Sequence, residues 1–203
     1  MMNPDPEVRR LLDIMPASGR MLCRIVDKPE QSRVINYSYP VPWSPNRPVF
    51  INFDLWSQLS RPQRDLALLR AVSWLIGIKW FKPDLYRGLI SIGLVGAGVE
   101  ALQGDAIGVL MAGSLAAIAG TQIWRSTQSS QRELETDEAA VRVALRRGYT
   151  EAEAARHLLE AIEAVAQIEG RLQLSFTELV RCQNLRAIAG LSPVGTPETL
   201  RQE

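Results

Sequence analysis

The sequence predicts an α+β protein that is mainly α-helical, with a small N-terminal antiparallel sheet, a transmembrane helical hairpin and C-terminal helices. Three observations lead to this prediction. Segments rich in β-branched residues and bounded by prolines occur near the N-terminus, residues 88–123 are almost uncharged, and the polar parts have helical periodicity with capping motifs. The formal net charge of +1 in 203 residues gives no reason to invoke nucleic acid. We divide the chain into residues 1–85, 86–125, 126–190 and a flexible tail, 191–203.

The N-terminal part is expected to hold one short helix followed by strands. Apolar residues at helical spacing over residues 5–15 predict the helix, which Gly19 is expected to break. The expected strands, rich in β-branched and aromatic residues, cover residues 21–26, 34–39 and 49–53. Four prolines within residues 40–48 predict an irregular loop, and a short helix is expected over residues 55–59.

A long apolar helix is expected next. Ser60 can cap its N-terminus, and Gln63 can complete the capping box. Residues 66–81 are apolar almost all round the helix, interrupted only by Arg70, Ser73 and Lys79. A helix with this pattern is buried or touches lipid.

The most hydrophobic region, residues 88–123, is interpreted as a transmembrane hairpin. Its only charged residues, Glu100 and Asp105, flank a turn at Gly104. The two resulting segments span roughly 24 and 28 Å at about 1.5 Å per residue, against a hydrocarbon core of about 30 Å. Small residues recur at a spacing of four, which lets two helices approach closely in lipid; they include Gly93, Ala97, Gly113, Ala117 and Gly120. The alternative is a soluble protein with a glycine-rich buried hairpin.

The charges around the hairpin predict its orientation. Interfacial aromatic residues, Tyr86 and Trp124, stand at its outer ends. Basic residues lie beyond both ends, whereas the tip carries only acids. The positive-inside rule then places both soluble flanks on the cytoplasmic side of a membrane that the chain crosses twice.

The C-terminal part is expected to be helical. Leu134, Val141 and Leu145 form an apolar stripe on a helix that Gly148 ends. Two further helices are expected, over residues 150–170 and 176–189, the first of them opened by a capping box. The only cysteines, Cys23 and Cys182, are expected to be small core residues in a reducing compartment.

Two segments carry a resemblance to a known family. Residues 131–163, QRELETDEAAVRVALRRGYTEAEAARHLLEAIE, contain E-x-x-x-D on a helix, then R-x-G-Y and a capped helix. Residues 47–77, RPVFINFDLWSQLSRPQRDLALLRAVSWLIG, form a strand, a short helix and a longer helix upstream. This layout resembles the membrane gluzincin metallopeptidases, the HtpX-like and CAAX-prenyl-protease group. The chain also resembles a family of uncharacterised cyanobacterial membrane proteins, which implies a thylakoid or plasma membrane.

The resemblance identifies a zinc site that has lost its ligands. In that group the two histidines of H-E-x-x-H and a glutamate on a second helix hold zinc. The resemblance places the ligands at positions 72, 76 and 133, the general base at 73 and a supporting carboxylate at 137. This chain has Val72, Ile76 and Ser73 there, and it keeps Glu133 and Asp137. One carboxylate cannot hold zinc, which takes about three or four protein ligands, so the resemblance implies a pseudopeptidase without metal, cofactor or enzymatic activity.

The resemblance also implies how the two helices meet. We expect the helix of Val72 and Ile76 to pack on the helix of Glu133 and Asp137, with aliphatic side chains where zinc would sit. Without the resemblance, the two carboxylates would be interpreted as a solvated helix face, since they lie four residues apart.

Three functions remain open at this point. The leading hypothesis is a non-catalytic integral membrane protein that acts as a binding or assembly factor, with the lipid bilayer and another membrane protein or complex as partners. A hydrolase with an unrecognised site around Glu133, Asp137 and His157 is the alternative from the enzyme class. A structural small subunit of a larger membrane complex is the third. His157 alone is interpreted as a surface histidine paired with Glu160, and no small-molecule substrate is inferred.

Overall fold

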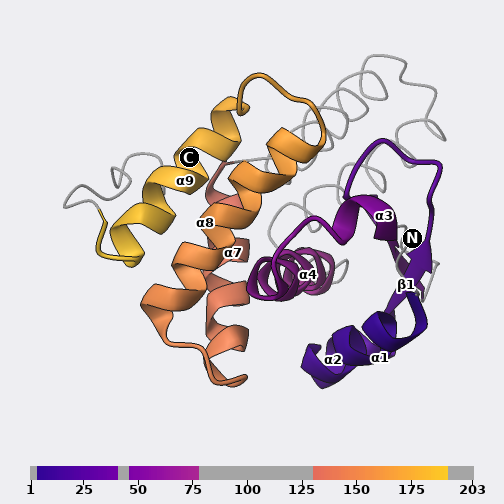
Figure 1. Ribbon diagram of the computed structural model, residues 1–203. Helices are drawn as coiled ribbons and strands as arrows, with labels where there is room; N and C mark the ends of the chain where they lie inside the picture. The colour runs from indigo at the N-terminus through magenta and orange to yellow at the C-terminus, as the bar shows by residue number, and fades with distance from the viewer. Residues whose placement is uncertain (1–3, 41–45, 78–129, 192–203) are drawn as a thin grey trace, which may run out of the picture. The chain divides into compact units, whose positions relative to one another are not determined.

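The computed structural model describes residues 4–40, 46–77 and 130–191, all of which belong to one compact unit of the chain (Figure 1). The expected hairpin, residues 86–125, lies outside these ranges, as do its small packing residues and most of the expected tail. None of the helices within the described ranges is long and apolar enough to cross a membrane.

The described part is mainly α-helical, with a small sheet near the N-terminus, as expected. Its seven helices and three strands follow one another in this order: α1 (Pro4–Ile14), α2 (Ala17–Leu22), β1 (Cys23–Asp27), β2 (Ile35–Tyr37), β3 (Arg47–Ile51), α3 (Phe53–Trp56), α4 (Arg61–Gly77), α7 (Ser130–Leu145), α8 (Glu151–Ile168) and α9 (Phe176–Ile188).

The sheet is mixed, so the prediction of an antiparallel sheet was wrong for one of its two strand pairs. Its order is β1-β3-β2; β3 pairs antiparallel with β2 but parallel with β1. Asn52 explains part of this order, because its side-chain amide donates to the carbonyls of Pro29 and Gln31 at 2.8 and 2.9 Å. Those bonds hold the segment after β1 against the end of β3. Because β3 pairs with β1 on one side, β2 can pair only with the other side of β3, at an edge of the sheet.

Gly19 does not break the first helix, contrary to expectation. It lies inside α2, and the break falls at Pro16, which precedes α2 and has no N–H to continue the α1 ladder. Gly19 is instead a point of close packing. A Cβ atom at this position would lie 2.7 Å from Cγ1 of Val72 on α4, so α2 and α4 approach more closely than any larger residue allows.

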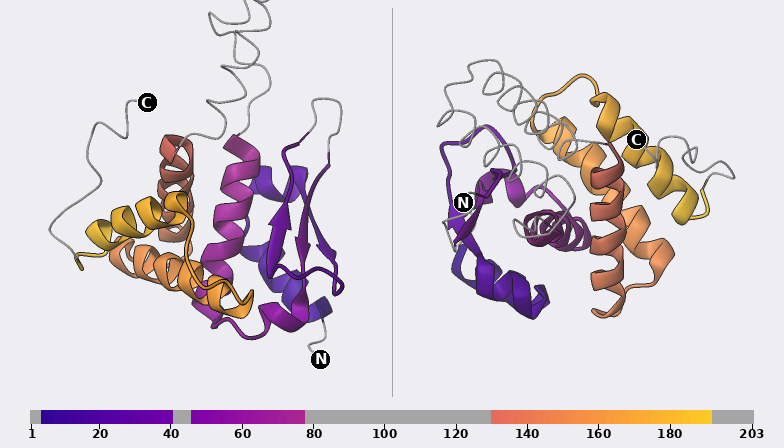
Figure 2. Two further views of the ribbon diagram at one scale, coloured as in Figure 1. Left: turned by 90° about the horizontal axis from the view of Figure 1, so that it is seen from above. Right: turned by 180° about the vertical axis from the view of Figure 1, so that it is seen from behind.

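Helix α4 is buried on two sides, which confirms the expectation from its apolar composition. One side contributes Leu68, Val72 and Leu75 to an N-terminal core shared with α1, the sheet and α3. The other side contributes Leu66 and Leu69 to a C-terminal core shared with α7, α8 and α9. Figure 2 shows α4 between the sheet and these three helices. The buried apolar side chains of α4 therefore belong to two different cores.

The C-terminal helices follow the predicted caps. Thr150 and Glu153 form a complete capping box at the start of α8, and Gly148 has a φ of +94° in the preceding turn. Of the predicted stripe on α7, Leu134 and Val141 are buried. Leu145 is 43 % exposed, contrary to expectation, because it is the last residue of α7, where the packed stretch ends.

Candidate functional site

A network of buried charges joins four elements at the contact between α4 and α7. We call it the central network; its members are Tyr37, Arg70, Trp74, Glu133, Asp137 and Arg181. Asp137 of α7 is fully buried, and Arg181 of α9 donates to both its oxygens, at 2.7 and 2.9 Å. Arg70 of α4 brings its Nε to 3.4 Å from Asp137 Oδ1. One carboxylate thus links α7 to both α4 and α9.

Arg70 makes the other contacts of the network. Its Nη2 donates to Glu133 Oε2, and its Nη1 donates to the hydroxyl of Tyr37 on β2. Trp74, one turn further along α4, donates its indole N–H to Glu133 Oε1 at 3.1 Å. Its ring also contacts the ring of Tyr37, with the two centroids 5.2 Å apart. Glu133 is therefore held by two side chains of one helix, four residues apart.

The network is electrically balanced, with two guanidinium groups and two carboxylates. Burial lowers the pKa of Arg70, and the charge of Arg181 acts in the same direction, whereas Tyr37 and Asp137 oppose it. Arginine stays protonated in proteins, so the unfavourable burial of this charge has to be offset by the groups that pair with it. Removing either carboxylate would leave a buried cation without compensation.

The structure brings together only part of the predicted site. Glu133 and Asp137 both belong to the central network, so they are not a solvated helix face. Val72 is fully buried in the N-terminal core, and Ile76 packs against the same core. Ser73 is half-buried. The helices pack together as expected, but the expectation of aliphatic side chains against Glu133 was wrong.

Sequence reasoning missed Arg70 and Trp74 as the residues that face Glu133. A signal for Arg70 was present, since an arginine inside a helix that is otherwise apolar needs a buried carboxylate partner. The two positions are also four residues apart, which places them on one face of α4. That face differs from the face of Val72, since two residues correspond to about 200° of helical rotation.

His157 lies on α8 and pairs as predicted. Its Nδ1 is 3.1 Å from Oε2 of Glu160, and its ring meets the ring of Tyr149 edge-on. None of its contacts within the described residues is with Glu133 or Asp137. In the same part of the chain, no group of three or more histidine, cysteine, aspartate or glutamate side chains could hold a metal ion.

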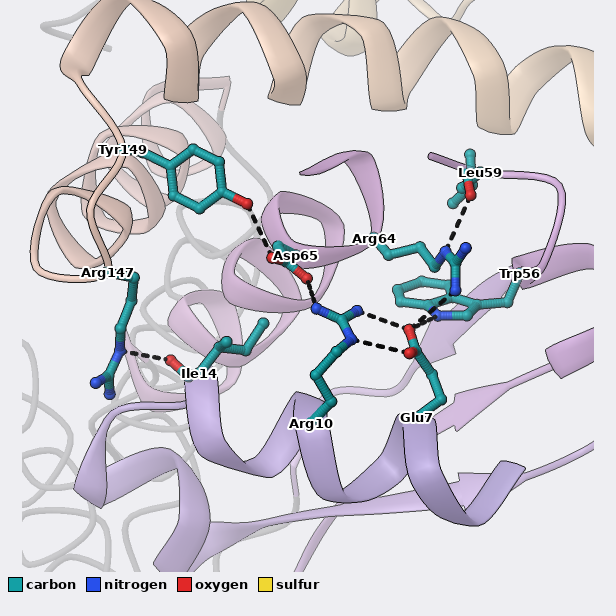
Figure 3. Close-up of polar contacts among 9 residues, drawn as sticks. All are labelled: Glu7, Arg10, Ile14, Trp56, Leu59, Arg64, Asp65, Arg147 and Tyr149. Atoms are coloured by element: carbon teal, nitrogen blue, oxygen red, sulfur yellow. Dashed lines mark hydrogen bonds and ion pairs between the residues drawn. The ribbon is translucent and has the colours of Figure 1, made fainter. Parts of the chain in front are cut away.

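A second buried cluster ties α1 to α3, α4 and the turn before α8 (Figure 3). We call it the N-terminal cluster; its members are Glu7, Arg10, Trp56, Arg64, Asp65 and Tyr149. Arg10 donates to both oxygens of Glu7, at 2.7 and 2.9 Å, and also to Asp65. Burial by itself would raise the pKa of Glu7, but Arg10, together with Trp56 and Arg64, lowers it to about 2.

The turn before α8 completes the N-terminal cluster. Tyr149 donates its hydroxyl to Asp65 Oδ2 at 2.8 Å, and Arg147 donates to the carbonyls of Ile14 and Met15 at 3.0 and 2.8 Å. Burial and the bond to Asp65 raise the pKa of Tyr149 to about 12. The R-x-G-Y turn singled out in the sequence thus fastens the end of α1 to the C-terminal helices.

In the part of the chain that the structure describes, a cleft adjoins the central network. The cleft has a volume of about 390 Å³ and lies between β2, α4, α8 and the start of α9. Tyr37, Arg70 and Arg181 are among its lining residues. The central network is therefore the candidate functional site of the described residues. The N-terminal cluster is interpreted as structural, because it stabilises the packing of α1 on α3, α4 and the turn before α8.

Comparison with known proteins places the chain in a family. No curated protein and no solved structure matches it. Residues 9–149, well over half of the 203 residues, match a family described as "Protein of unknown function (DUF3318)". The match includes Arg70, Glu133 and Asp137, whereas Arg181 lies beyond it. The chain therefore belongs to the DUF3318 family.

Proposed function

We propose that this protein is a non-catalytic, peptidase-like membrane protein that acts as a binding or assembly factor for membrane proteins or complexes. One observation supports the proposal above the others. Arg70 and Trp74, four residues apart on α4, both donate to Glu133 on α7. In the metallopeptidases that the chain resembles, two histidines at this spacing and a glutamate from a second helix converge on zinc. Here a guanidinium group and an indole converge on the glutamate instead.

This geometry moves the inferred remnant of H-E-x-x-H by two residues along α4. The corresponding segment is Arg70-Ala71-Val72-Ser73-Trp74, so the general base would fall at Ala71. Guanidinium and indole groups only donate hydrogen bonds and offer no lone pair to a metal. An alanine cannot accept a proton from water. The segment therefore lacks the parts needed to activate water, and we expect the protein to contain no stoichiometric zinc when it is purified without added metal.

The membrane part of the proposal is supported by the sequence of residues 86–125. We propose that these residues cross the membrane twice, packed through Gly93, Ala97, Gly113, Ala117 and Gly120, with both soluble flanks in the cytoplasm. The membrane is the plasma membrane or the thylakoid membrane. A cysteine introduced at Gly104 should react with an impermeant thiol reagent from outside, and one at Gln128 should not. The opposite pattern rejects the orientation, and equal labelling of both in a carbonate-extractable protein rejects the hairpin.

A gain-of-metal variant tests the peptidase-like geometry. Arg70→His with Trp74→His would place two imidazoles and Glu133 in the arrangement of a three-ligand zinc site. We expect this double variant to bind one equivalent of Co²⁺ or Zn²⁺, seen in the visible absorption of tetrahedral Co²⁺, but to remain without peptidase activity. If the double variant keeps the circular dichroism of the wild type and binds no metal, the geometric basis of the proposal is lost.

The matched control uses the positions that the sequence indicated. Val72→His with Ile76→His introduces the same two imidazoles at the same spacing, but in the N-terminal core. We expect this variant to be destabilised and to bind no metal, because Glu133 does not face that core. Metal binding by the control at the level of the test variant would show that the register inferred from Arg70 and Trp74 is wrong.

The binding role is tested by purification from membranes in a mild detergent. An assembly factor should recover a substoichiometric set of membrane proteins that changes with growth conditions. A single stoichiometric partner would favour a structural subunit of a larger complex instead. Recovery of no membrane protein above the level of an unrelated tagged control would reject both.

A further inference from the structure

The cleft beside the central network has one apolar wall. Leu158, Ala161, Ile162 and Val165 line it from α8, three or four residues apart on one face of the helix. Ile35 of β2 is also among the lining residues. At about 390 Å³ the cleft falls within the range of small-molecule sites, roughly 300–1,000 Å³. A ligand held here would place hydrocarbon against α8.

The carboxylates that line the cleft are already engaged. Glu169 accepts from the backbone N–H of Val34 at 3.0 Å and from Arg171 at 3.1 Å. Both oxygens of Glu178 accept from Arg171, at 2.9 and 2.8 Å, and one of them also accepts from the N–H of Ser175. These acids therefore serve to hold the ends of α8 and α9.

The donors that line the cleft are not all engaged. Arg70 lines the cleft, and its Nε, which is buried 3.4 Å from its ion-pair partner Asp137, has no hydrogen-bond acceptor of good geometry within the described residues. Arg181 uses Nε and Nη2 on Asp137, which leaves its Nη1. Arg33 makes only a 3.5 Å contact with Asn36 in the described structure. The cleft thus has arginine N–H groups without acceptors, whereas its carboxylates already accept hydrogen bonds. A ligand that suits this lining is one that supplies hydrogen-bond acceptors.

We propose that this cleft binds an anionic amphiphile, a carboxylate or phosphate group that carries a short hydrocarbon chain. The anionic group lies against Arg33, Arg70 and Arg181, and the hydrocarbon lies along the apolar wall of α8. Charge-assisted bonds to guanidinium groups hold carboxylates and phosphates alike. The free anion and a lipid headgroup are the two possible sources of this chemistry. The inference goes beyond the proposed function and does not depend on the peptidase-like geometry. The cleft is present whether or not α4 corresponds to the H-E-x-x-H helix of a peptidase.

The test measures binding of hexanoate and of hexyl phosphate to the full chain in a nonionic detergent, by isothermal titration calorimetry. Acetate and hexanol serve as probes that lack the chain and the charge respectively. We expect saturable binding of at least one hexyl anion. It should bind at least about tenfold tighter than acetate, since each buried CH₂ contributes about 0.8 kcal/mol, and at least about tenfold tighter than hexanol, which lacks the charge that pairs with guanidinium groups. Absence of saturable binding for both hexyl anions, or equal binding of hexanol, overturns the proposal.

Two variants locate the binding in the cleft. Arg33→Gln removes an exposed donor and should weaken binding about tenfold. Val165→Phe narrows the apolar wall and should weaken hexanoate more than acetate. Arg156→Gln, an exposed change elsewhere on α8, is the control and should leave affinity unchanged. Binding that is insensitive to both cleft variants places the ligand elsewhere and overturns the assignment.

A reconstituted sample distinguishes the two sources. The full chain is placed in phosphatidylcholine bilayers with or without phosphatidate, and hexyl phosphate is titrated into each. Competition by phosphatidate, lost in Arg33→Gln, supports the proposal with a lipid headgroup as the ligand. Unchanged affinity in both bilayers, together with the effects of the cleft variants, supports it with a free amphiphile.

Discussion

The two buried charge clusters that share α4 have the same composition but differ in completeness. Each has two arginines, two carboxylates, a tryptophan and a tyrosine. In both clusters every carboxylate oxygen accepts at least one hydrogen bond, and in the N-terminal cluster no buried side-chain nitrogen or oxygen lacks a partner. In the central network the Nε of Arg70 has no acceptor, and the cluster lines a cleft.

This difference distinguishes a structural cluster, the N-terminal one, from a candidate site, the central network. A saturated cluster has nothing left to bind, so its value lies in fixing the helices that contribute to it. A network with a buried donor left over carries a cost that the fold alone does not explain. The two clusters therefore predict different responses to mutation, although their charges are alike.

The largest expected effect is that of Asp137→Ala. This change leaves Arg181 without its carboxylate and deprives Arg70 of one of its two carboxylate partners, so it should lower the free energy of unfolding by about 3–5 kcal/mol. Urea unfolding followed by circular dichroism measures the change. Glu135→Ala, an exposed change on the same helix, should stay within about 0.5 kcal/mol of the wild type. A loss below about 1 kcal/mol for Asp137→Ala would mean that water, and not Asp137, solvates the two arginines.

The second effect is a pH dependence that belongs to the N-terminal cluster. The pKa of Glu7 is lowered from 4.5 to about 2, so its contribution to stability is fully present above pH 4.5 and is lost as the pH falls through about 2. Glu7→Gln should cost about 3 kcal/mol at pH 7, from the size of that shift. The difference between variant and wild type should shrink steadily below pH 4.5. A difference that stays constant from pH 7 to pH 2.5 would contradict the charged pairing of Glu7.

The clusters also show how far the sequence predicts the fold. Local signals identified the elements well, because the capping boxes, Gly148 and the helical stripe on α7 act over a few residues. The strand order did not follow from local signals. It depends on Asn52 reaching back to Pro29 and Gln31, a contact between segments that no periodicity reveals. The close packing of Gly19 against Val72 is likewise a contact between distant segments that no periodicity reveals.

The candidate site was predictable in its carboxylates but not in their partners. Glu133 and Asp137 stood out because their spacing resembled a known motif. Arg70 and Trp74 did not, since which face of an all-round apolar helix meets α7 is decided by the packing of both cores. Arg181 could not be found from the motif either, because its helix lies beyond the resembled segment.

The third effect concerns the close approach on the N-terminal side of α4. Gly19→Ala should destabilise the protein by about 1–3 kcal/mol, since the added Cβ would lie 2.7 Å from Val72 Cγ1. Combining it with Val72→Ala should bring less than the sum of the two single losses, because the smaller side chain makes room for the new methyl group. Thermal unfolding of the four proteins measures this coupling. Additive losses would show that Val72 does not pack on α2.

The smallest effect, and the most direct comparison of the clusters, comes from removing one tyrosine hydroxyl on each side. Tyr149→Phe leaves Asp65 Oδ2 without its donor inside a saturated cluster, and it should cost about 1–2 kcal/mol. Tyr37→Phe removes an acceptor from Arg70 at the wall of the cleft, where water or a ligand can replace it, so the loss should stay below about 1 kcal/mol. Urea unfolding of both variants gives the two values. The reverse order would mean that the central network is the structural cluster, and that the cleft beside it has no spare donor for a ligand.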